Sequence, residues 1–289
     1  MKQNDWLPQP SKTLADWLIN ARHLLEPVTN QPGIEAQMVG AFVLQKSRSW
    51  IISHPEIELS ASEESRMDSC LQQLIEGYPF AYLSGEREFY GRNFDVRPGL
   101  LVPRPETELL IEQAFDWLHN HPDRRLAVDV GCGTGCIAVT LAAEIHDMQI
   151  DAIDVDPLAI DMTIHNAKKH HVVHQIHVLS GDLLSNSPGR YDLICANLPY
   201  IPSDTLSDLP AARFEPLLAL DGGIDGLRLI EKLLQQSQSY LRPGGLILLE
   251  IEASQGESAP SLVRKYFPTA QVTMHKDLAD LPRLVSVQI

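Results

Sequence analysis

A short glycine-rich turn near the middle of the chain has the residue types of a ligand site. It comprises Gly131, Cys132, Gly133, Thr134 and Gly135. Glycine lets the backbone approach a ligand that a Cβ atom would exclude, and a helix that starts at such a turn offers free N–H groups. A dinucleotide fingerprint, G-x-G-x-x-G/A, would end at position 136, which is Cys136. The turn therefore predicts a nucleoside site without a pyrophosphate, or else a turn that only tightens helix packing.

Two aspartates follow the next two apolar runs. Asp154 could accept two hydrogen bonds from a ribose diol, and Asp182 is placed to meet an adenine amine, with Leu183 as apolar cover. The alternative is that both acids are solvated helix caps. Their spacing favours the nucleoside site, because the carboxyl ends of successive parallel strands meet at one edge of a sheet.

The segment Asn197-Leu198-Pro199-Tyr200 could hold a planar amide or amine. The nitrogen of such a group is a poor nucleophile because its lone pair is delocalised, so it must be held in line with its electrophile. The side-chain carbonyl of Asn197 and the backbone carbonyl of Leu198 can each accept one of its N–H groups. Pro199 removes a competing N–H, and Tyr200 would form a wall against the planar group. Asn197, Pro199 and Tyr200 are the candidate catalytic residues, and no strong general base is needed.

Both motifs resemble those of class I S-adenosylmethionine (AdoMet) methyltransferases. The glycine turn is similar to their cofactor turn, and residues 197–200 to the (Asp/Asn)-Pro-Pro-(Tyr/Phe) signature of enzymes that methylate planar nitrogens, with Leu198 where Pro is usual. The resemblance implies AdoMet as cofactor and S-adenosyl-L-homocysteine as product. The segment also resembles adenine dimethyltransferases of ribosomal RNA, so this motif alone leaves the acceptor open. A β-turn with an N-cap Asn is the structural alternative.

The elements that must position these residues form a regular pattern. From residue 126 onward, apolar runs alternate with helical patterns, which predicts parallel strands, right-handed crossovers and a sheet covered on both faces. Predicted strands cover residues 126–130, 150–155, 176–179, 191–196, 246–251, 271–275 and 284–288, and predicted helices cover 136–145, 158–169 and 227–241. The fold class is α/β, a Rossmann-like and mostly parallel sheet.

A small helical domain is predicted before this sheet. Its helical patterns cover residues 14–25, with Thr13 and Asp16 placed as a capping box, residues 34–47, and a stretch that follows Ser60 or Ser62 and ends at Gly77. Next come two β-prone runs around a Gly/Asn turn, which predict a hairpin, and then a helix that starts at Pro105. The predicted domains are an N-terminal helical substrate-recognition domain (1–80), a linker with a β-hairpin (81–104) and an AdoMet-dependent methyltransferase domain (105–289).

Composition narrows the class of protein. The 289 residues include 23 Lys and Arg against 38 Asp and Glu, a formal net charge of −15, which argues against stable binding of nucleic acid through its phosphates. The first ten residues lack the apolar core of a signal peptide, and no 18-residue apolar run is present, so we expect a cytoplasmic protein without a membrane partner. Four cysteines without a C-x-x-C pair, and a histidine cluster at 165–177 whose spacing fits no ligand template, predict no metal site.

Further segments resemble one family, the bacterial protein-(glutamine) methyltransferases that modify peptide chain release factors. Residues 82–85 and 88–91 match its linker, 103–108 match its P-R-P-E-T-E signature, and 215–227 match its E-P-x-x-A-L-x-G-G-x-D-G-L segment. Residues 249–251 and 276–283 resemble its C-terminal strands, although Asp280 replaces the usual Gly. The P-R-P-E-T-E signature and the G-G-x-D-G-L stretch together are far more specific than the general methyltransferase motifs.

The resemblance implies a substrate and a set of roles. The substrate would be the side-chain amide nitrogen of the glutamine in the Gly-Gly-Gln loop of release factors one and two. The glycine turn, Asp154 and Leu183 would bind AdoMet, with Asn197 near the cofactor and residues 197–200 on the glutamine. Arg104 and Glu106, in the P-R-P-E-T-E segment, would line the acceptor side. The helical domain would grip the release factor at a second place, and the enzyme is expected to be a monomer.

Three other functions remain as alternatives. One is a glutamine methyltransferase of a ribosomal protein, which the intact P-R-P-E-T-E segment disfavours. Another is an adenine-nitrogen methyltransferase of RNA or DNA, which Leu198 favours and the net charge opposes. The last is a nucleoside-binding regulatory protein without catalysis, which the intact Asn197-x-Pro199-Tyr200 pattern opposes.

Overall fold

The computed structural model describes residues 13–289 and divides the chain into two compact units, Met1–Ser84 and Gly85–Ile289. The division falls after Ser84, so the hairpin that we predicted as a separate linker is part of the second unit. The prediction for the first ten residues lies outside the described part of the chain.

The first unit is helical. Its elements are α1 (Leu14–Leu25), α2 (Pro32–Leu44), α3 (Arg48–Ser53), α4 (Ala61–Ile75) and α5 (Phe80–Ser84). Thr13 and Asp16 form the predicted capping box at α1, and Ser60 with Glu63 forms a second one at α4. The helix predicted at 34–47 ends earlier, because Gln45 takes a left-handed conformation (φ 53°) and Ser47 caps the short α3. A core around Trp17, which is 1% exposed, holds these helices together.

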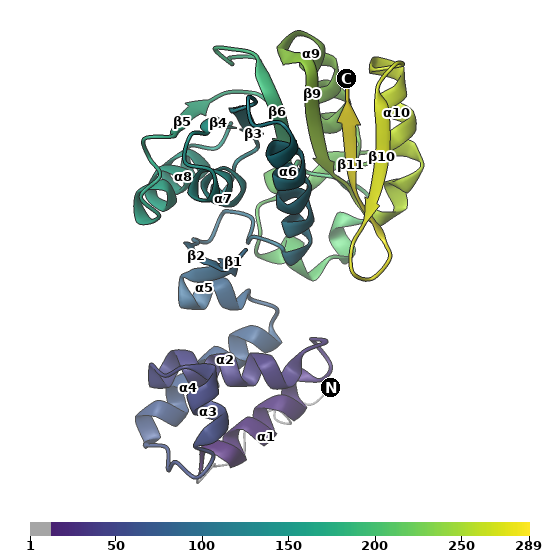
Figure 1. Ribbon diagram of the computed structural model, residues 1–289. Coiled ribbons are helices and arrows are strands. Elements are labelled where there is room, and N and C mark those ends of the chain that lie inside the picture. Colours follow the sequence, from purple (N-terminus) through teal and green to yellow (C-terminus); the bar gives the residue numbers. More distant parts are fainter. Residues whose placement is uncertain (1–12) are drawn as a thin grey trace. The chain divides into compact units, whose positions relative to one another are not determined.

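A seven-stranded sheet forms the centre of the second unit (Figure 1). Its strands are β3 (Leu126–Val130), β4 (Gln149–Asp154), β5 (Ile176–Ser180), β6 (Tyr191–Ala196), β9 (Leu241–Glu250), β10 (Gln271–Lys276) and β11 (Pro282–Gln288). The order is β10-β11-β9-β6-β3-β4-β5. Strands β5, β4, β3, β6 and β9 run parallel, whereas β11 is antiparallel to β9 and β10 to β11. The strand order reverses beside β3, and ligands bind at such switch points.

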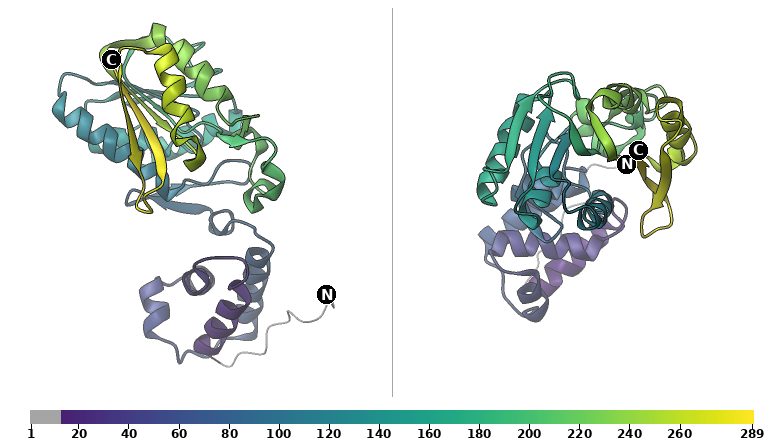
Figure 2. Two further views of the ribbon diagram at one scale, coloured as in Figure 1. Left: turned by 90° about the vertical axis from the view of Figure 1, so that its right-hand side faces the viewer. Right: turned by 45° about the horizontal axis from the view of Figure 1, so that its top comes forward.

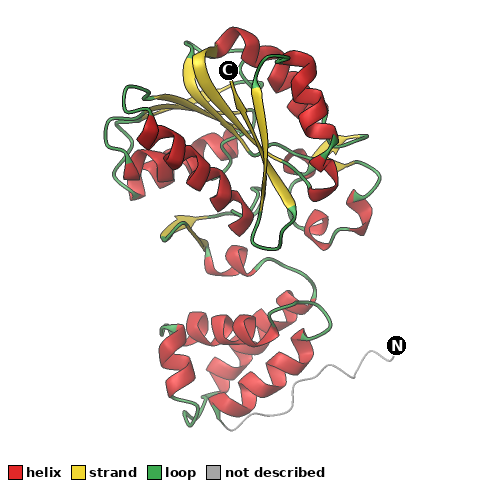
Figure 3. Cartoon of the chain, turned by 45° about the vertical axis from the view of Figure 1, so that its right-hand side comes forward, coloured by secondary structure: helices red, strands yellow, loops and turns green. Residues whose placement is uncertain are grey.

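Helices cover both faces of this sheet, as predicted (Figures 2 and 3). One face packs against α6 (Glu108–Asn120), α7 (Cys136–Glu144) and the end of α8 (Pro157–Lys169), and the other against α9 (Arg228–Tyr240) and α10 (Ser258–Tyr266). Successive strand residues alternate between the two cores: Ala127 and Leu193 face the first, whereas Val128 and Ile194 face the second. This double burial explains why the central strands are mostly apolar.

One α-helix and two short strands of the second unit were absent from the prediction, as were its short 3₁₀ helices after residue 205. Helix α10 has apolar residues at helical spacing (Ala259, Leu262, Val263 and Tyr266), but it is only nine residues long and was overlooked. Strands β7 (Ile201–Pro202) and β8 (Asp221–Gly223) are too short for a pattern, and they pair in parallel outside the main sheet. Among the described residues, no helix is long and apolar enough to cross a membrane.

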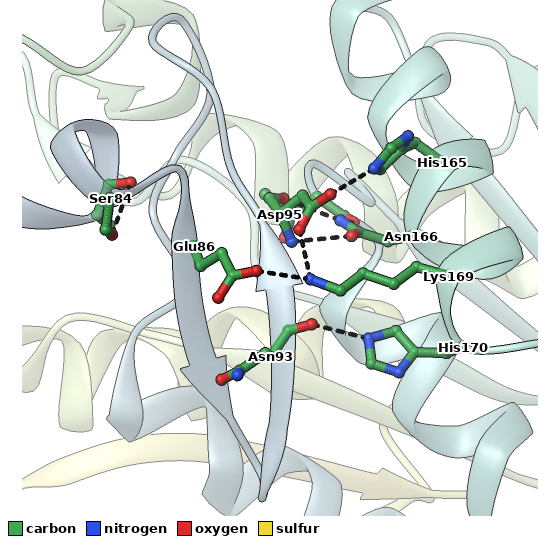
Figure 4. A network of polar contacts seen from close by, with 10 residues as sticks. Ser84, Glu86, Asn93, Asp95, His165, Asn166, Lys169 and His170 are labelled. Carbon is green, nitrogen blue, oxygen red and sulfur yellow. Dashed lines mark hydrogen bonds and ion pairs between the residues drawn. The ribbon is translucent and has the colours of Figure 1, made fainter. Parts of the chain in front are cut away.

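The predicted hairpin, β1 (Glu86–Phe89) and β2 (Arg92–Asp95), is fastened to α8 (Figure 4). The Asp95 carboxylate forms an ion pair with Lys169 and a hydrogen bond with His165, and the Asn166 side chain bonds both the N–H and the carbonyl of Asp95, at 2.9 and 3.0 Å. His170 contacts the backbone carbonyl of Asn93 at 3.0 Å. Part of the histidine cluster thus joins two elements, and no group of metal-ligand side chains occurs among the residues described.

Candidate active site

A cavity of about 290 Å³ lies at the carboxyl ends of β3, β4, β5 and β6, inside the second unit. Its size is near the lower end of the range for ligand pockets, roughly 300–1,000 Å³. Its walls include these predicted site residues: Arg104, Gly131, Cys132, Gly133, Thr134, Asp154, Asp182, Leu183, Asn197, Leu198 and Pro199. Residues from five separate parts of the chain therefore share one cavity, and the spacing of the glycine turn, Asp154 and Asp182 predicted that these three would meet.

Three other predicted residues do not line the cavity: Gly135, Tyr200 and Glu106. Gly135 packs on α8, where an added Cβ would lie 2.9 Å from the methyl carbon of Thr163. The missing side chain at this position therefore allows close helix packing, which was the alternative interpretation of the turn. Glu106 is exposed, and its predicted contact with an acceptor protein stays a prediction.

The glycine turn leaves room for a ligand at its middle glycine. Gly131, Gly133 and Gly135 all have positive φ, of 75°, 55° and 79°. A Cβ added to Gly133 would meet nothing within 4 Å, so this backbone borders open space in the cavity. The turn is held from behind, because the N–H groups of Gly131 and Cys132 donate to the carbonyl of Ile153, at 2.8 and 3.1 Å.

Asp154 lies at the end of β4 and contacts the glycine turn. One carboxylate oxygen, Oδ2, accepts the N–H of Gly133 at 2.9 Å, and Oδ1 accepts the N–H of Asp156 at 3.0 Å. Burial raises the pKa of Asp154, while these two backbone N–H groups oppose the shift. Each oxygen keeps a lone pair for a ligand hydroxyl, so the predicted ribose contact is compatible with a second, structural task.

The adenine side of the predicted site contains an unexpected ion pair. Asp182 is exposed, lines the cavity and pairs with Lys232 of α9. Its carboxylate is thus already engaged by a cation where we predicted a contact with an adenine amine. Leu183 is buried and forms apolar wall as predicted, and it does so in a left-handed conformation with φ 55°. Such a conformation is strained for a branched residue and commonly marks a ligand site.

Asn197 follows β6 and is oriented by a residue of the P-R-P-E-T-E segment. Its side-chain Nδ2 donates to Oγ1 of Thr107 at 2.9 Å. Thr107, in the short 3₁₀ helix η1 (Pro105–Thr107), is 1% exposed. With the nitrogen engaged by Thr107, the Oδ1 atom of Asn197 is the free acceptor. Thr107 belongs to the P-R-P-E-T-E segment, but its contact with Asn197 was not predicted from the sequence.

Tyr200 is held at its hydroxyl and at its backbone. The hydroxyl donates to Oε1 of Glu250 at 3.2 Å, and the carbonyl accepts the side-chain N–H of Gln255 at 2.9 Å. Burial raises the pKa of Tyr200, and the Glu250 carboxylate raises it further. The phenol is therefore a neutral donor at physiological pH.

Two glycines of the G-G-x-D-G-L segment contact residues 197–200, which we call the acceptor motif after their predicted role. A Cβ at Gly222 would lie 2.8 Å from the carbonyl oxygen of Pro199, and one at Gly226 (φ 72°) would overlap the carbonyl oxygen of Tyr200. The segment thus packs directly against the backbone of the acceptor motif, which only glycine permits. The carbonyl groups of that motif are fixed from behind.

Arg104 forms an ion pair with Glu215, whose side chain is 1% exposed. The other carboxylate oxygen of Glu215 accepts the N–H of Val102 at 3.0 Å. This carboxylate joins the P-R-P-E-T-E segment to the E-P-x-x-A-L segment. Arg104 also lines the cavity, so its predicted contact with the acceptor protein stays a prediction beside this structural one.

Two buried acids near the cavity were not predicted as functional. Asp129, two residues before Gly131, is 1% exposed; its Oδ2 accepts the N–H of Ala138 at 3.1 Å, and its Oδ1 has no hydrogen-bond partner among the described residues. Burial raises its pKa to about 7. Glu250, at the end of β9, is 1% exposed, and burial also raises its pKa to about 7. The signal for both was an acid at the end of an apolar strand.

These features fit a nucleoside cofactor with a sulfonium group. Gly133 leaves the open backbone edge that such a ligand needs, Asp154 offers acceptors for ribose hydroxyls, and Leu183 with Leu100 offers apolar cover for a base. Burial holds the thiols of Cys132 and Cys136 neutral by raising their pKa values, that of Cys136 to about 12. They act as small wall residues that present no nucleophile to an alkylating ligand.

Two family models match the chain. The model of the PrmC N-terminal domain matches residues 16–85, and that of the methyltransferase small domain matches residues 106–214. The release factor glutamine methyltransferase of Koribacter versatilis is 36% identical over 268 residues, covering 91% of this chain and 94% of that protein. Those of Coxiella burnetii and Escherichia coli are 34% and 36% identical, covering 92% and 84% of this chain and 95% and 87% of those proteins.

Solved structures agree on the fold. The catalytic domain of human Mettl16, in complex with MAT2A 3′UTR hairpin 6, has a TM-score of 0.55 at 15% identity and covers 79% of this chain and 82% of that chain. The 16S rRNA N2 G1207 methyltransferase of T. thermophilus, in complex with AdoMet and guanosine, has a TM-score of 0.53 at 17% identity, covering 70% and 49%. These likenesses confirm the class I AdoMet methyltransferase fold. The curated relatives span most of the chain at more than 30% identity, so the chain belongs to the release factor glutamine methyltransferase family.

Proposed function

We propose that this enzyme transfers the methyl group of AdoMet to the side-chain amide nitrogen of the glutamine in the Gly-Gly-Gln loop of release factors one and two, in the cytoplasm. One observation supports this assignment above the others. Asn197 borders the cavity with its nitrogen engaged by Thr107 at 2.9 Å, so that its oxygen is the acceptor for an incoming N–H group.

The residues of this chain position the acceptor and do not activate it by deprotonation. Oδ1 of Asn197 and the backbone carbonyl of Leu198 would each accept one N–H of the glutamine amide, which aims the nitrogen lone pair along one line. Leu198 stands where Pro is usual, but its carbonyl is unchanged, and its buried side chain lies 3.1 Å from a Cβ placed at Gly131. The departure from the usual motif therefore adds packing between the acceptor motif and the glycine turn.

Bound AdoMet supplies an electrophilic methyl group on a positively charged sulfur. The glycine turn, Asp154 and Leu183 would hold the cofactor, which would supply the methyl group, and the amide nitrogen held by Asn197 and Leu198 would release one proton to water. Asn197 and the carbonyl of Leu198 stabilise the positive charge that develops on the nitrogen, because both are fixed oxygen dipoles. Such a site needs no ionised general base next to the nitrogen.

The helical unit and the P-R-P-E-T-E segment would supply selectivity. Free glutamine offers the same amide as a release factor, so discrimination requires contacts away from the reacting nitrogen. Independent contacts on one protein multiply their affinities when both can be made together. We assign this second contact to the helical unit, whose model is matched at residues 16–85.

Transfer of labelled methyl groups tests the proposal. Purified enzyme with labelled AdoMet is incubated with release factor one, with release factor two, and with each carrying a Gln→Ala change in the Gly-Gly-Gln loop. We expect label in the two native factors, none in the altered ones, and N5-methylglutamine at the loop by mass spectrometry. Label in tRNA, rRNA or a ribosomal protein, with none in either release factor, would overturn the proposal.

A further inference from the structure

A buried carboxylate connects the two sides of the acceptor motif. Glu250 ends β9, is 1% exposed and accepts the Tyr200 hydroxyl at Oε1. The hydroxyl of Thr107 acts on the same carboxyl and lowers its pKa against the effect of burial. Thr107 in turn accepts the side-chain N–H of Asn197. One acid therefore binds the last residue of the acceptor motif directly and acts on the hydroxyl that holds the first.

The direction of the hydrogen bonds decides what Asn197 presents to a substrate. A threonine hydroxyl can donate or accept, and an asparagine side chain can present either its oxygen or its nitrogen. Oε2 of Glu250 is buried without a hydrogen-bond partner among the described residues, and an ionised carboxylate only accepts, so this oxygen attracts the hydroxyl proton of Thr107. The lone pairs of Thr107 then face Asn197 and can bind only its nitrogen, which leaves its oxygen for the substrate.

We propose that Glu250 and Thr107 are positioning residues: Thr107 fixes Asn197 with its oxygen toward the methyl acceptor, and Glu250 orients Thr107 and holds the Tyr200 hydroxyl. This inference rests on the proposed function, because the orientation matters for an acceptor that donates N–H groups. When Glu250 is neutral, its own proton can be donated to Thr107, whose proton can then turn toward Asn197. The asparagine loses its preferred orientation, although the fold is unchanged.

The surroundings of Glu250 allow it to change charge near neutrality. Burial is the largest effect and raises its pKa to about 7. The Thr107 and Tyr200 hydroxyls and Arg283 lower the pKa of Glu250, whereas Glu106 raises it. Glu250 in turn raises the pKa of the neutral Cys136 thiol. Arg283 also pairs with Asp277, at 3.1 Å, so its charge is shared. The ionised form that orients Thr107 thus becomes more populated as the pH rises through 7.

Four substitutions separate orientation from packing. Thr107→Val keeps the shape of the side chain and removes the hydroxyl, whereas Thr107→Ser keeps the hydroxyl. Thr140→Val is the matched control, because Thr140 is fully buried in α7 and its hydroxyl has no hydrogen-bond partner among the described residues. Glu250→Gln keeps the shape of Glu250 and fixes it as neutral. For each variant, kcat and KM with a release factor and the Kd for AdoMet are measured.

We expect Thr107→Val to lower kcat roughly 10- to 100-fold, the effect of misplacing a reacting group, with the Kd for AdoMet unchanged. Thr107→Ser restores most of kcat, and Thr140→Val has the wild-type value. Wild-type kcat/KM rises with pH through a single ionisation at or below about pH 7, and Glu250→Gln removes this rise and has a low kcat at every pH. Wild-type kcat in Thr107→Val, or an unchanged pH profile in Glu250→Gln, would overturn the inference.

A measurement without turnover keeps this inference apart from the proposed function. The side-chain amide protons of Asn197, assigned by their loss in Asn197→Asp, are followed in ¹H–¹⁵N spectra of the AdoMet-free enzyme. We expect slow exchange that persists in Thr107→Ser and disappears in Thr107→Val. A wild type that methylates no release factor refutes the proposed function, whereas fast exchange of the wild-type Asn197 amide refutes the positioning role.

Discussion

Oδ2 of Asp154 and the backbone N–H of Gly133 form a 2.9 Å hydrogen bond that ties the end of β4 to the middle of the glycine turn. Because Gly133 borders open space in the cavity, Asp154, which also lines the cavity, holds the loop that forms one of its walls. Loss of this side chain would therefore disturb two walls of the site together. The acceptor motif, held by Thr107 and Glu250, is fastened by separate contacts.

This separation predicts different effects for substitutions at the two walls. Asp154→Ala removes the ligand-facing carboxylate and the tie to Gly133, so we expect AdoMet binding to weaken roughly 10- to 100-fold, as for lost hydrogen bonds to a charged group. Asn197→Ala should lower kcat strongly and leave most of the affinity for AdoMet. Calorimetric titration with AdoMet and steady-state kinetics with a release factor measure the two effects. Comparable losses of affinity and of kcat in both variants would contradict the assignment.

Substitution of Asn166, which lies outside the cavity, should affect cofactor binding. Its side-chain nitrogen donates to the carbonyl of Thr134 at 2.9 Å and to that of Asp95, and it is fully buried. Asn166→Ala leaves these carbonyls without their donor, at a cost of about 1–3 kcal/mol for each buried group. We expect a lower thermal midpoint and weaker AdoMet binding. His165→Ala, which loses only a half-exposed contact with Asp95, is the control and should bind AdoMet normally.

The raised pKa of Glu250 predicts how stability depends on pH. The folded protein binds its proton more tightly than the unfolded chain, whose glutamates titrate near 4.5, so the free energy of unfolding falls as the pH rises from 4.5 through 7. A shift to about 7 corresponds to at most about 3 kcal/mol. The ionised form that we assign to activity is thus the less stable one.

Glu250→Gln tests this relation. Between pH 5 and pH 8 the wild-type thermal midpoint should fall more than that of the variant, although Asp129 contributes a decrease of the same sign in both proteins. Scanning calorimetry at several pH values measures the difference. Equal decreases in the two proteins would show that Glu250 does not titrate in this range.

The sheet and most of the residues that line the cavity could be predicted from the sequence, but the contacts between these residues and their neighbours could not. Strands at 126–130 and 191–196 have the predicted bounds, because each is apolar except for one buried aspartate, Asp129 or Asp192, and ends at a turn. The bond between Asn197 and Thr107 joins residues 90 positions apart, and no local pattern encodes such a pair. The pairing of Asp182 with Lys232 was missed for the same reason, since an acid that could meet a ligand could equally meet a lysine on another helix.

A pair of glycines with positive φ separates the effect of close packing behind the acceptor motif from the effect of backbone strain. Gly226 and Gly91 have almost the same φ, 72° and 70°, but a Cβ at Gly226 would overlap the carbonyl of Tyr200, whereas one at Gly91 would meet nothing within 4 Å. Both Gly→Ala variants bear the left-handed penalty of about 1–2 kcal/mol. Only Gly226→Ala must also displace Tyr200, and we expect it to lose most of kcat and several degrees more of thermal stability. Gly91→Ala should keep wild-type kcat. If the two variants lost stability equally and both remained active, the close approach of Gly226 to the acceptor motif would have no part in holding it.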